Sequence, residues 1–247
     1  MAASDMSMTL RSARQELKTC LMLGVDFVPI GSETAVVAAP ASAAPASPPV
    51  SDLSDKAALL AALEARHAAE CPHCTTATGY KRIVFGEGNP EAALMFVGEA
   101  PGEQEDETGR PFVGRAGQKL DEIIAAMKMR RADVYIANVL KARPPGNRTP
   151  LPDEVARCGP YLVEQIRIIR PRVIVTLGGP ASKLLLQTDE GITRLRGSWH
   201  VWRDGDVEIP VMPTFHPAYL LRNYTVDTRA KVWSDMQAVM AKLAERS

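Results

Sequence analysis

The chain has 247 residues, of which 46% are hydrophobic, so it is long enough to bury the core of one domain with an appendage. Its 29 basic and 29 acidic side chains cancel, so its net charge neither requires nor excludes a polyanionic partner. No run approaches the roughly 20 uninterrupted apolar residues that a membrane helix needs, and the start lacks a basic segment followed by an apolar one. These features argue against a membrane protein and predict a cytoplasmic location.

The first 52 residues differ in composition from the rest. Leucines at helical intervals predict an amphipathic helix over residues 5–24, within an extension that spans residues 1–34. Residues 35–52 repeat Ala, Pro and Ser with almost no charge, which is typical of an extended linker. We therefore place the globular domain at residues 53–247 and expect the extension either to dock a protein partner or to be inert.

Strand and helix signals alternate through the globular domain. The expected helices span residues 55–70, 117–127, 152–169 and 227–244, with a short one beyond Pro180, and the expected strands span residues 93–97, 134–137, 172–178 and 211–215. A hairpin with its turn at residues 204–206 precedes the last strand. Alternation of this kind predicts an α/β fold with a mainly parallel sheet and helices on both of its faces.

Three polar side chains stand at the ends of these strands: Glu99, Asn138 and His216. Because the carboxyl ends of parallel strands lie on one edge of a sheet, we expect a carboxylate, an amide and an imidazole to meet in one crevice. An amide both donates and accepts, which suits the polar edge of a nucleobase. Taken singly, a strand-end Asn can cap a turn and a His can be a structural hydrogen bonder, so the prediction depends on all three.

The loop of residues 98–117 has the sequence GEAPGEQEDETGRPFVGRAG. Its glycines indicate close approach of backbone to another group, and Phe112 places a flat ring near Glu99, which suits a flat ligand. The alternative is a solvated surface loop. The loop carries neither of the common glycine-rich phosphate-binding motifs.

Two further loops carry residues that suit a nucleic acid. Residues 138–152 form a proline-stiffened loop whose cations either meet phosphates or are simply solvated: Lys141, Arg143 and Arg148. Residues 216–224 offer a wedge and clamp for opening a duplex, although adjacent leucines also occur in cores: Leu220, Leu221 and Arg222.

Cysteine spacing is the remaining signal. Cys71 and Cys74 form a C-x-x-C pair, Cys158 lies far downstream, and Cys20 falls in the extension. In a reducing compartment such cysteines more often bind metal or do redox chemistry than form disulfides. The alternative is that they are small buried hydrophobic residues.

These blocks together resemble the family 4 uracil-DNA glycosylases over about residues 68–245. The blocks GEAPGEQEDETGRPFVGRAG, VYIANVLKARPPGNR and TFHPAYLLR occur in the family's order and approximate spacing. The resemblance implies a three-layer α/β/α sandwich with a short, mainly parallel central sheet. It also implies an enzyme that hydrolyses the bond between uracil and deoxyribose in DNA, leaving an abasic site in base excision repair. We expect the chain to be a monomer. A partner of residues 1–34 would then be a repair or replication protein.

By this resemblance, Phe112 stacks on the flipped uracil, Asn138 reads its polar edge, and His216 faces its O2. Glu99 orients or activates water and stabilises the cationic sugar, with backbone near Ala100 helping to place that water. The chemistry agrees, because cleavage leaves an electron-poor sugar and an electron-rich pyrimidine, which call for a carboxylate on one side and a donor on the other. No catalytic metal is required.

The block contains a second acidic position, Glu105, which we include among the catalytic candidates.

The resemblance also implies a four-iron four-sulfur cluster held by four cysteines. Three of those positions carry cysteine here: Cys71, Cys74 and Cys158. The fourth is Ala142, so another ligand completes the site, three protein ligands hold the cluster, or the cluster is absent. Three retained cysteines favour a bound cluster, and Cys20 and His73 are the candidate substitutes.

Two other functions compete with the glycosylase. A non-catalytic DNA-damage-binding module with the same fold is the alternative to the enzyme, whereas the missing phosphate loops argue against a general nucleotide-binding domain. A related branch of the superfamily captures its product covalently through a histidine in an inserted basic loop. Residues 141–152 contain neither that histidine nor the insertion, so we predict no covalent capture.

Overall fold

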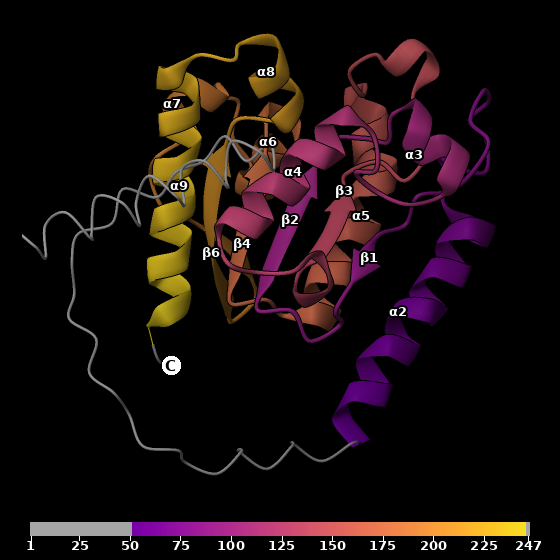
Figure 1. Ribbon diagram of the computed structural model, residues 1–247. Coiled ribbons are helices and arrows are strands. Elements are labelled where there is room, and N and C mark those ends of the chain that lie inside the picture. The colour runs from indigo at the N-terminus through magenta and orange to yellow at the C-terminus, as the bar shows by residue number, and fades with distance from the viewer. Residues whose placement is uncertain (1–50, 246–247) are drawn as a thin grey trace, which may run out of the picture. The chain divides into compact units, whose positions relative to one another are not determined.

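The computed structural model describes residues 51–245, with side chains from residue 56 onward (Figure 1). The expected helix at residues 5–24, the extension and all but the end of the linker lie outside the described residues. The helices are α2 (Ser51–Glu70), α3 (Glu103–Thr108), α4 (Arg115–Ala126), α5 (Pro152–Ile169), α6 (Gly179–Leu186), α7 (Ile192–Leu195), α8 (Pro217–Arg222) and α9 (Val226–Ala244). The strands are β1 (Glu87–Gly88), β2 (Leu94–Gly98), β3 (Tyr135–Asn138), β4 (Val173–Leu177), β5 (His200–Asp204) and β6 (Val207–Thr214).

The described strands form one sheet in the order β1-β3-β2-β4-β6-β5. The four central strands are parallel, and the edge strands β1 and β5 pair antiparallel with their neighbours. Helices lie on both faces of the sheet (Figure 1). The predicted α/β fold with a mainly parallel sheet is therefore confirmed.

Strand β2 shows why both faces are covered. All its residues are buried, and side chains alternate between the faces. Met95 and Val97 belong to the same apolar cluster as Leu162 and Ile166 of α5. An unbroken apolar run is typical of a central parallel strand that is buried on both sides.

The strand register aligns the carboxyl ends of the central strands. Gly98 of β2 lies opposite Asn138 of β3, and Leu177 of β4 lies opposite Thr214 of β6. Strands β2 and β4 are themselves paired up to Val97. The residues that follow these strands therefore emerge at one edge of the sheet.

Two of the short helices lie inside the segments that were expected to be loops of the site. Helix α3 begins after Gly102 within the glycine-rich segment, and α8 begins after His216. Each has six residues, too few to show a helical period in the sequence. Acidic residues in the first turn of α3 and Pro217 at the start of α8 favour these helices locally. Among the described helices, none is long and apolar enough to cross a membrane.

Candidate functional site

A cavity of about 440 Å³ opens at the carboxyl edge of the sheet. It is lined by residues from the glycine-rich segment, the end of β3, the proline-rich loop and α8. Among them are Glu99, Ala100, Glu105, Phe112, Asn138, Arg148, His216 and Arg222. The structure therefore brings together the three strand-end residues and the aromatic ring that the sequence singled out.

Phe112 lies at the cavity in a constrained backbone. Its φ is 50°, its side chain is 5% exposed, and its ring centroid lies 5.7 Å from that of His216. A Cβ at Gly117 would lie 2.0 Å from the Phe112 carbonyl oxygen, and one at Gly98 would lie 2.4 Å from Cζ of the ring. These two glycines therefore provide the space in which the ring and its backbone sit.

The side chain of Glu105 holds the backbone of the same segment. Its carboxylate accepts hydrogen bonds from the N–H groups of Val113 and Gly114, each at 2.8 Å, and from Gly102 at 3.1 Å. Both carboxylate oxygens therefore have backbone donors, and they join the start of α3 to the residues after Phe112.

Arg131 supports the backbone at Phe112, and the sequence did not single it out. Its guanidinium donates to the Phe112 carbonyl at 3.1 Å and to the Pro111 carbonyl at 2.5 Å. It also pairs with Glu87 and Asp121, each at 2.8 Å. No motif marks this position, because its contacts come from residues distant in the chain.

Asn138 is the last residue of β3 and is 1% exposed. Its side-chain Oδ1 is buried without a hydrogen-bond partner in the described part of the chain. Its backbone carbonyl accepts a hydrogen bond from Lys141 Nζ at 2.9 Å. A buried amide atom left unpaired is costly unless a ligand satisfies it, so its position at the cavity suits base recognition.

His216 caps helix α8 with its ring. The backbone N–H of Ala218 donates to His216 Nδ1 at 3.1 Å. Burial, reinforced by the Arg222 guanidinium, lowers the pKa of His216 to about 4, so the ring is neutral near pH 7. With Nδ1 accepting, the proton of the neutral ring lies on Nε2.

Glu99 follows β2 directly and is half-buried. Burial raises the pKa of the Glu99 carboxyl above its usual range, and no charged group among the described residues offsets that effect. A carboxylate with a raised pKa in a cavity is suited to accept a proton.

Comparison with known proteins identifies the family. Residues 85–237 match the model of the Uracil DNA glycosylase superfamily. The chain is 48% identical to a type-4 uracil-DNA glycosylase from Thermotoga maritima, over 68% of this chain and 86% of that protein. The chain belongs to the type-4 uracil-DNA glycosylase family.

Other relatives agree with this assignment. A type-4 uracil-DNA glycosylase from Sulfurisphaera tokodaii is 47% identical over 62% of this chain and 72% of its own length. A type-5 uracil-DNA glycosylase from Pyrobaculum aerophilum is 31% identical over 59% of this chain and 71% of its own length.

Two of the DNA contacts expected in this type-4 family member need correction. Lys141 is fully buried, and its ammonium donates to the Asn138 carbonyl and to Gln165 Oε1 at 2.5 Å, so it does not reach phosphates. Complete burial lowers the pKa of Lys141 to about 8. Leu220 is also fully buried, because the short helix α8 turns it inward, whereas the wedge required an exposed side chain.

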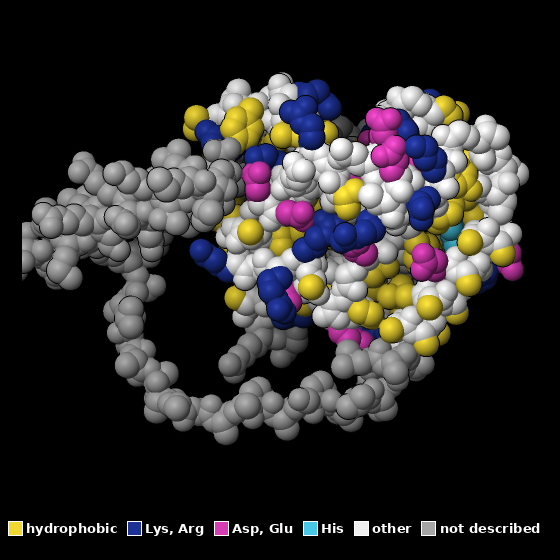
Figure 2. Space-filling model, turned by 45° about the vertical axis from the view of Figure 1, so that its right-hand side comes forward, with side chains coloured by type: hydrophobic (Ala, Val, Ile, Leu, Met, Phe, Trp, Pro, Cys, Tyr) yellow, Lys and Arg dark blue, Asp and Glu magenta, His cyan; other side chains and the backbone are white. Residues whose placement is uncertain are grey.

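The other expected DNA contacts lie closer to the surface. Leu221 is half-buried and Arg222 is exposed. The Arg148 side chain is 38% exposed and pairs with Glu154 at 2.7 Å, and the Arg143 side chain is 19% exposed and lies 3.8 Å from Asp106. On the face drawn in Figure 2, Lys and Arg side chains are interspersed with Asp and Glu.

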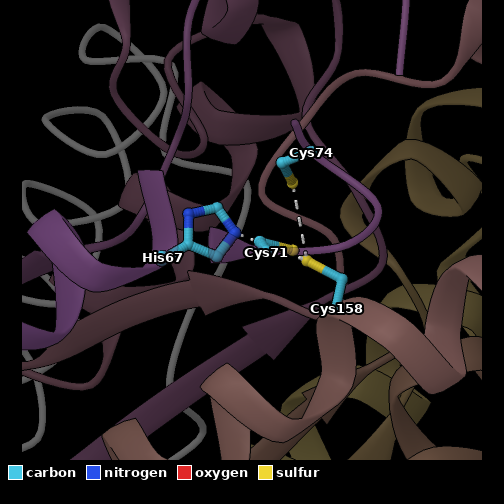
Figure 3. A group of neighbouring side chains, drawn as sticks. All are labelled: His67, Cys71, Cys74 and Cys158. Atoms are coloured by element: carbon cyan, nitrogen blue, oxygen red, sulfur yellow. Dashed lines mark hydrogen bonds between the residues drawn. The ribbon is translucent and has the colours of Figure 1, made fainter. Parts of the chain in front are cut away.

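A second group of neighbouring side chains lies outside the cavity of this type-4 family member. His67, Cys71, Cys74 and Cys158 point toward one another, and their ligand atoms all lie within 4.8 Å of each other (Figure 3). All four side chains are buried. The group is compatible with a metal ion or an iron–sulfur centre, as the retained cysteines suggested.

The histidine of this group is not the one that the sequence suggested. His73 is buried but does not belong to the group, and Cys20 lies outside the described residues. His67 precedes Cys71 by four residues, a spacing that places two residues on the same side of a helix. That spacing is the signal that sequence reasoning overlooked.

Proposed function

We propose that this chain is a uracil-DNA glycosylase that hydrolyses the N-glycosidic bond of a uracil flipped out of DNA, leaving an abasic site for base excision repair. Membership of the type-4 family supports this function. The observation that carries it is that one cavity is lined by a carboxylate, a buried unpaired amide, a neutral imidazole and an aromatic ring.

The flipped base is held by three side chains. Phe112 offers a flat apolar face for stacking, and a stacked base gains about 1–3 kcal/mol from such a contact. Asn138 pairs its amide with the polar edge of uracil, which satisfies the buried oxygen that has no partner in the described chain. His216 donates a hydrogen bond from its Nε2–H group to O2 of the base.

The bond breaks between C1′ of the sugar and N1 of uracil. Its electron pair moves into the pyrimidine, where the hydrogen bond from His216 stabilises the negative charge that develops on O2. Glu99 stabilises the cationic sugar and takes a proton from the water that attacks C1′, with the backbone near Ala100 placing that water. The neutral state of His216 suits this role, because it donates a hydrogen bond without carrying a charge itself.

Glu105 acts as a positioning residue in this scheme. The three backbone hydrogen bonds to its carboxylate support this positioning role, since they fix the segment that carries Phe112. Arg131 supports the same segment through the carbonyls of Pro111 and Phe112.

DNA outside the cavity is bound by the exposed cations of the cavity rim. Arg148 and Arg222 line the cavity and suit phosphates, Arg143 is a further candidate from the proline-rich loop, and Leu221 is the remaining candidate for the duplex-opening wedge. We propose a monomer whose catalytic domain is residues 53–247, with residues 1–34 docking a repair or replication protein.

The cofactor proposal concerns the His67 group. A four-iron four-sulfur cluster remains the form implied by the family resemblance, although the fourth cysteine position is Ala142. The three thiols and the imidazole are a donor set suited to a metal centre. None of the four residues lines the cavity. A metal centre held by them would therefore have a structural role, linking α2, the C-x-x-C loop and α5.

Uracil release from a labelled oligonucleotide, read as cleavage at the resulting abasic site, tests the function. The wild-type chain is expected to release uracil from single-stranded and duplex substrates. Glu99→Gln is expected to lower the rate by about 100-fold or more, the typical effect of losing a general base. Asn138→Ala is expected to lower it by a similar factor, because the base loses its polar contact.

Glu103→Gln is the matched control. Glu103 is exposed on α3 and does not line the cavity, so this variant is expected to keep wild-type activity. Binding of the uracil oligonucleotide without any base release by the wild-type chain would instead establish the non-catalytic DNA-damage-binding module.

A further inference from the structure

The His67 group has a geometry of its own. The end of α2 supplies His67, the segment after it supplies Cys71 and Cys74, and α5 supplies Cys158 (Figure 3). His67, Cys71 and Cys158 are 0% exposed and Cys74 is 2% exposed. Three thiols and an imidazole buried together are a metal-binding donor set rather than an ordinary apolar core.

The spacings between Cys158 and two of its neighbours match a single tetrahedral ion. Zinc binds Cys sulfur at about 2.3 Å and His nitrogen at about 2.0–2.1 Å, so ligand atoms around it lie about 3.5–3.8 Å apart. Here Cys74 Sγ lies 3.9 Å from Cys158 Sγ, and His67 Nε2 lies 3.7 Å from the same sulfur. A tetrahedron of four ligands around one ion therefore requires only small side-chain adjustments.

The same spacing is too narrow for a four-iron cluster. Each thiolate of such a cluster binds a different iron, so the sulfurs stand further apart than the ligands of one ion. The sulfurs of Cys74 and Cys158 are 3.9 Å apart, and the position of the fourth cysteine carries Ala142. Among the described residues, His67 is the fourth ligand that the fold brings to the three thiols.

The ring of His67 is held in place by its neighbours. It lies against Tyr161 at a centroid distance of 4.7 Å and against Phe85 at 5.7 Å, which fixes its direction. Its Nε2 lies 3.7 Å from Cys158 Sγ, so this nitrogen faces the thiols. A histidine nitrogen together with three cysteine sulfurs is an ordinary ligand set for structural zinc.

The surroundings also balance the charge. Three thiolates and one divalent ion leave a single net negative charge, which is costly to bury alone. The buried ammonium of Lys141 is electrostatically coupled to all three cysteines. It offsets that charge, which gives the buried lysine a second reason to be there besides its bond to Asn138.

We propose that His67 replaces the missing fourth cysteine and that His67, Cys71, Cys74 and Cys158 bind one zinc ion. All four positions of the ion are filled by protein, so the site is structural and closed to substrate. It fastens the end of α2 to α5, and it does not depend on the glycosylase activity proposed above.

Metal analysis of the full-length chain is the direct test. The protein is purified anaerobically from cells supplied with both iron and zinc, and zinc, iron and acid-labile sulfide are measured per chain. We expect one zinc per chain, without sulfide and without the visible absorption of iron–sulfur centres. Iron and sulfide in a four-to-four ratio, or a metal-free protein, would overturn the proposal.

Variants of His67 test the ligand itself. His67→Ala is expected to lose zinc at a chelator concentration at which the wild-type chain keeps it, and His67→Cys is expected to keep it. His73→Ala is the matched control, because His73 is a buried neighbour outside the group, and it is expected to keep zinc.

Cobalt substitution covers the case in which His67→Ala does not fold. The visible spectrum of Co²⁺ reports its ligands, so the wild-type chain should show a tetrahedral site with three sulfurs, and His67→Cys should show one with four. Identical spectra for the two proteins, or full zinc retention in His67→Ala, would contradict ligation by His67. None of these readouts depends on uracil release, so a failed proposal here is distinguishable from a failed glycosylase assignment.

Discussion

The backbone N–H of Ala218 donates to Nδ1 of His216 at 3.1 Å, and this bond determines which ring nitrogen carries the proton. A short helix thus sets the chemistry of the residue that caps it. Because the pKa of His216 is lowered to about 4, the ring presents a neutral Nε2–H donor to the cavity at physiological pH.

We therefore predict that His216 does not titrate between about pH 5 and pH 8. Side-chain ¹⁵N NMR should show a protonated Nε2 and an unprotonated Nδ1 over that range. The ordinary pKa of about 6.5 in the unfolded chain lies above the folded value, so this group costs stability as the pH falls from about 6.5 toward the folded pKa. His216→Gln should weaken the pH dependence of the unfolding free energy in that window, whereas an imidazolium signal at pH 6 would refute the prediction.

Glu99 should impose the acid limb of the activity profile. Because burial raises its pKa, the rate of uracil release should fall with decreasing pH at a midpoint above the ordinary glutamate value of about 4.3. Single-turnover rates across the pH range would show this limb in the wild-type chain and in Glu103→Gln but not in the residual activity of Glu99→Gln.

Glu99 should also cost stability. Its folded pKa lies above the unfolded one, so folding disfavours the charged form at neutral pH. Glu99→Gln is expected to raise the unfolding temperature at pH 7, and a lowered unfolding temperature would show that the carboxylate has stabilising partners in the folded chain.

Gly98→Ala should close the base pocket. The added Cβ would lie 2.3 Å from Asn138 Oδ1 and 2.4 Å from Phe112 Cζ, so both groups must move. A displacement of this size is expected to cost about 100-fold in uracil release. Gly179→Ala is the matched control, since nothing lies within 4 Å of its Cβ, and equal losses in both variants would count against the pocket.

Substitutions of Lys141 and Arg222 should affect different properties, the first stability and the second DNA binding. Lys141→Met leaves the Asn138 carbonyl and Gln165 Oε1 without their buried donor, so it is expected to lower the free energy of unfolding by about 2 kcal/mol. It should leave the salt dependence of DNA binding unchanged, because the ammonium is buried. Arg222→Ala should instead lower the slope of log affinity against log salt by about 1. Thermal unfolding and binding titrations at several salt concentrations measure both effects. If Lys141→Met changed the slope of log affinity against log salt, Lys141 would contact a phosphate after all.

The sequence by itself determined the class of fold and the positions of the strand-end residues. Apolar runs such as 93–97 and 172–178, separated by helical patterns, are sufficient for a parallel sheet, because the two faces must both be covered. Helix α5 (Pro152–Ile169) was predicted with its observed bounds, since proline at its start and a long apolar period mark it clearly. The motifs also gave the family, and with it the residues that line the cavity.

Only the tertiary structure decided what each charged or apolar loop residue contacts. Lys141 and Leu220 looked available to DNA, but burial depends on elements that pack over them from elsewhere in the chain, which a local pattern does not contain. For the same reason Arg131 and His67 were missed: one holds carbonyls about 20 residues away, and the other meets Cys158 across 91 residues. Helical spacing placed His67 beside Cys71, but only folding brought the third and fourth ligands to them.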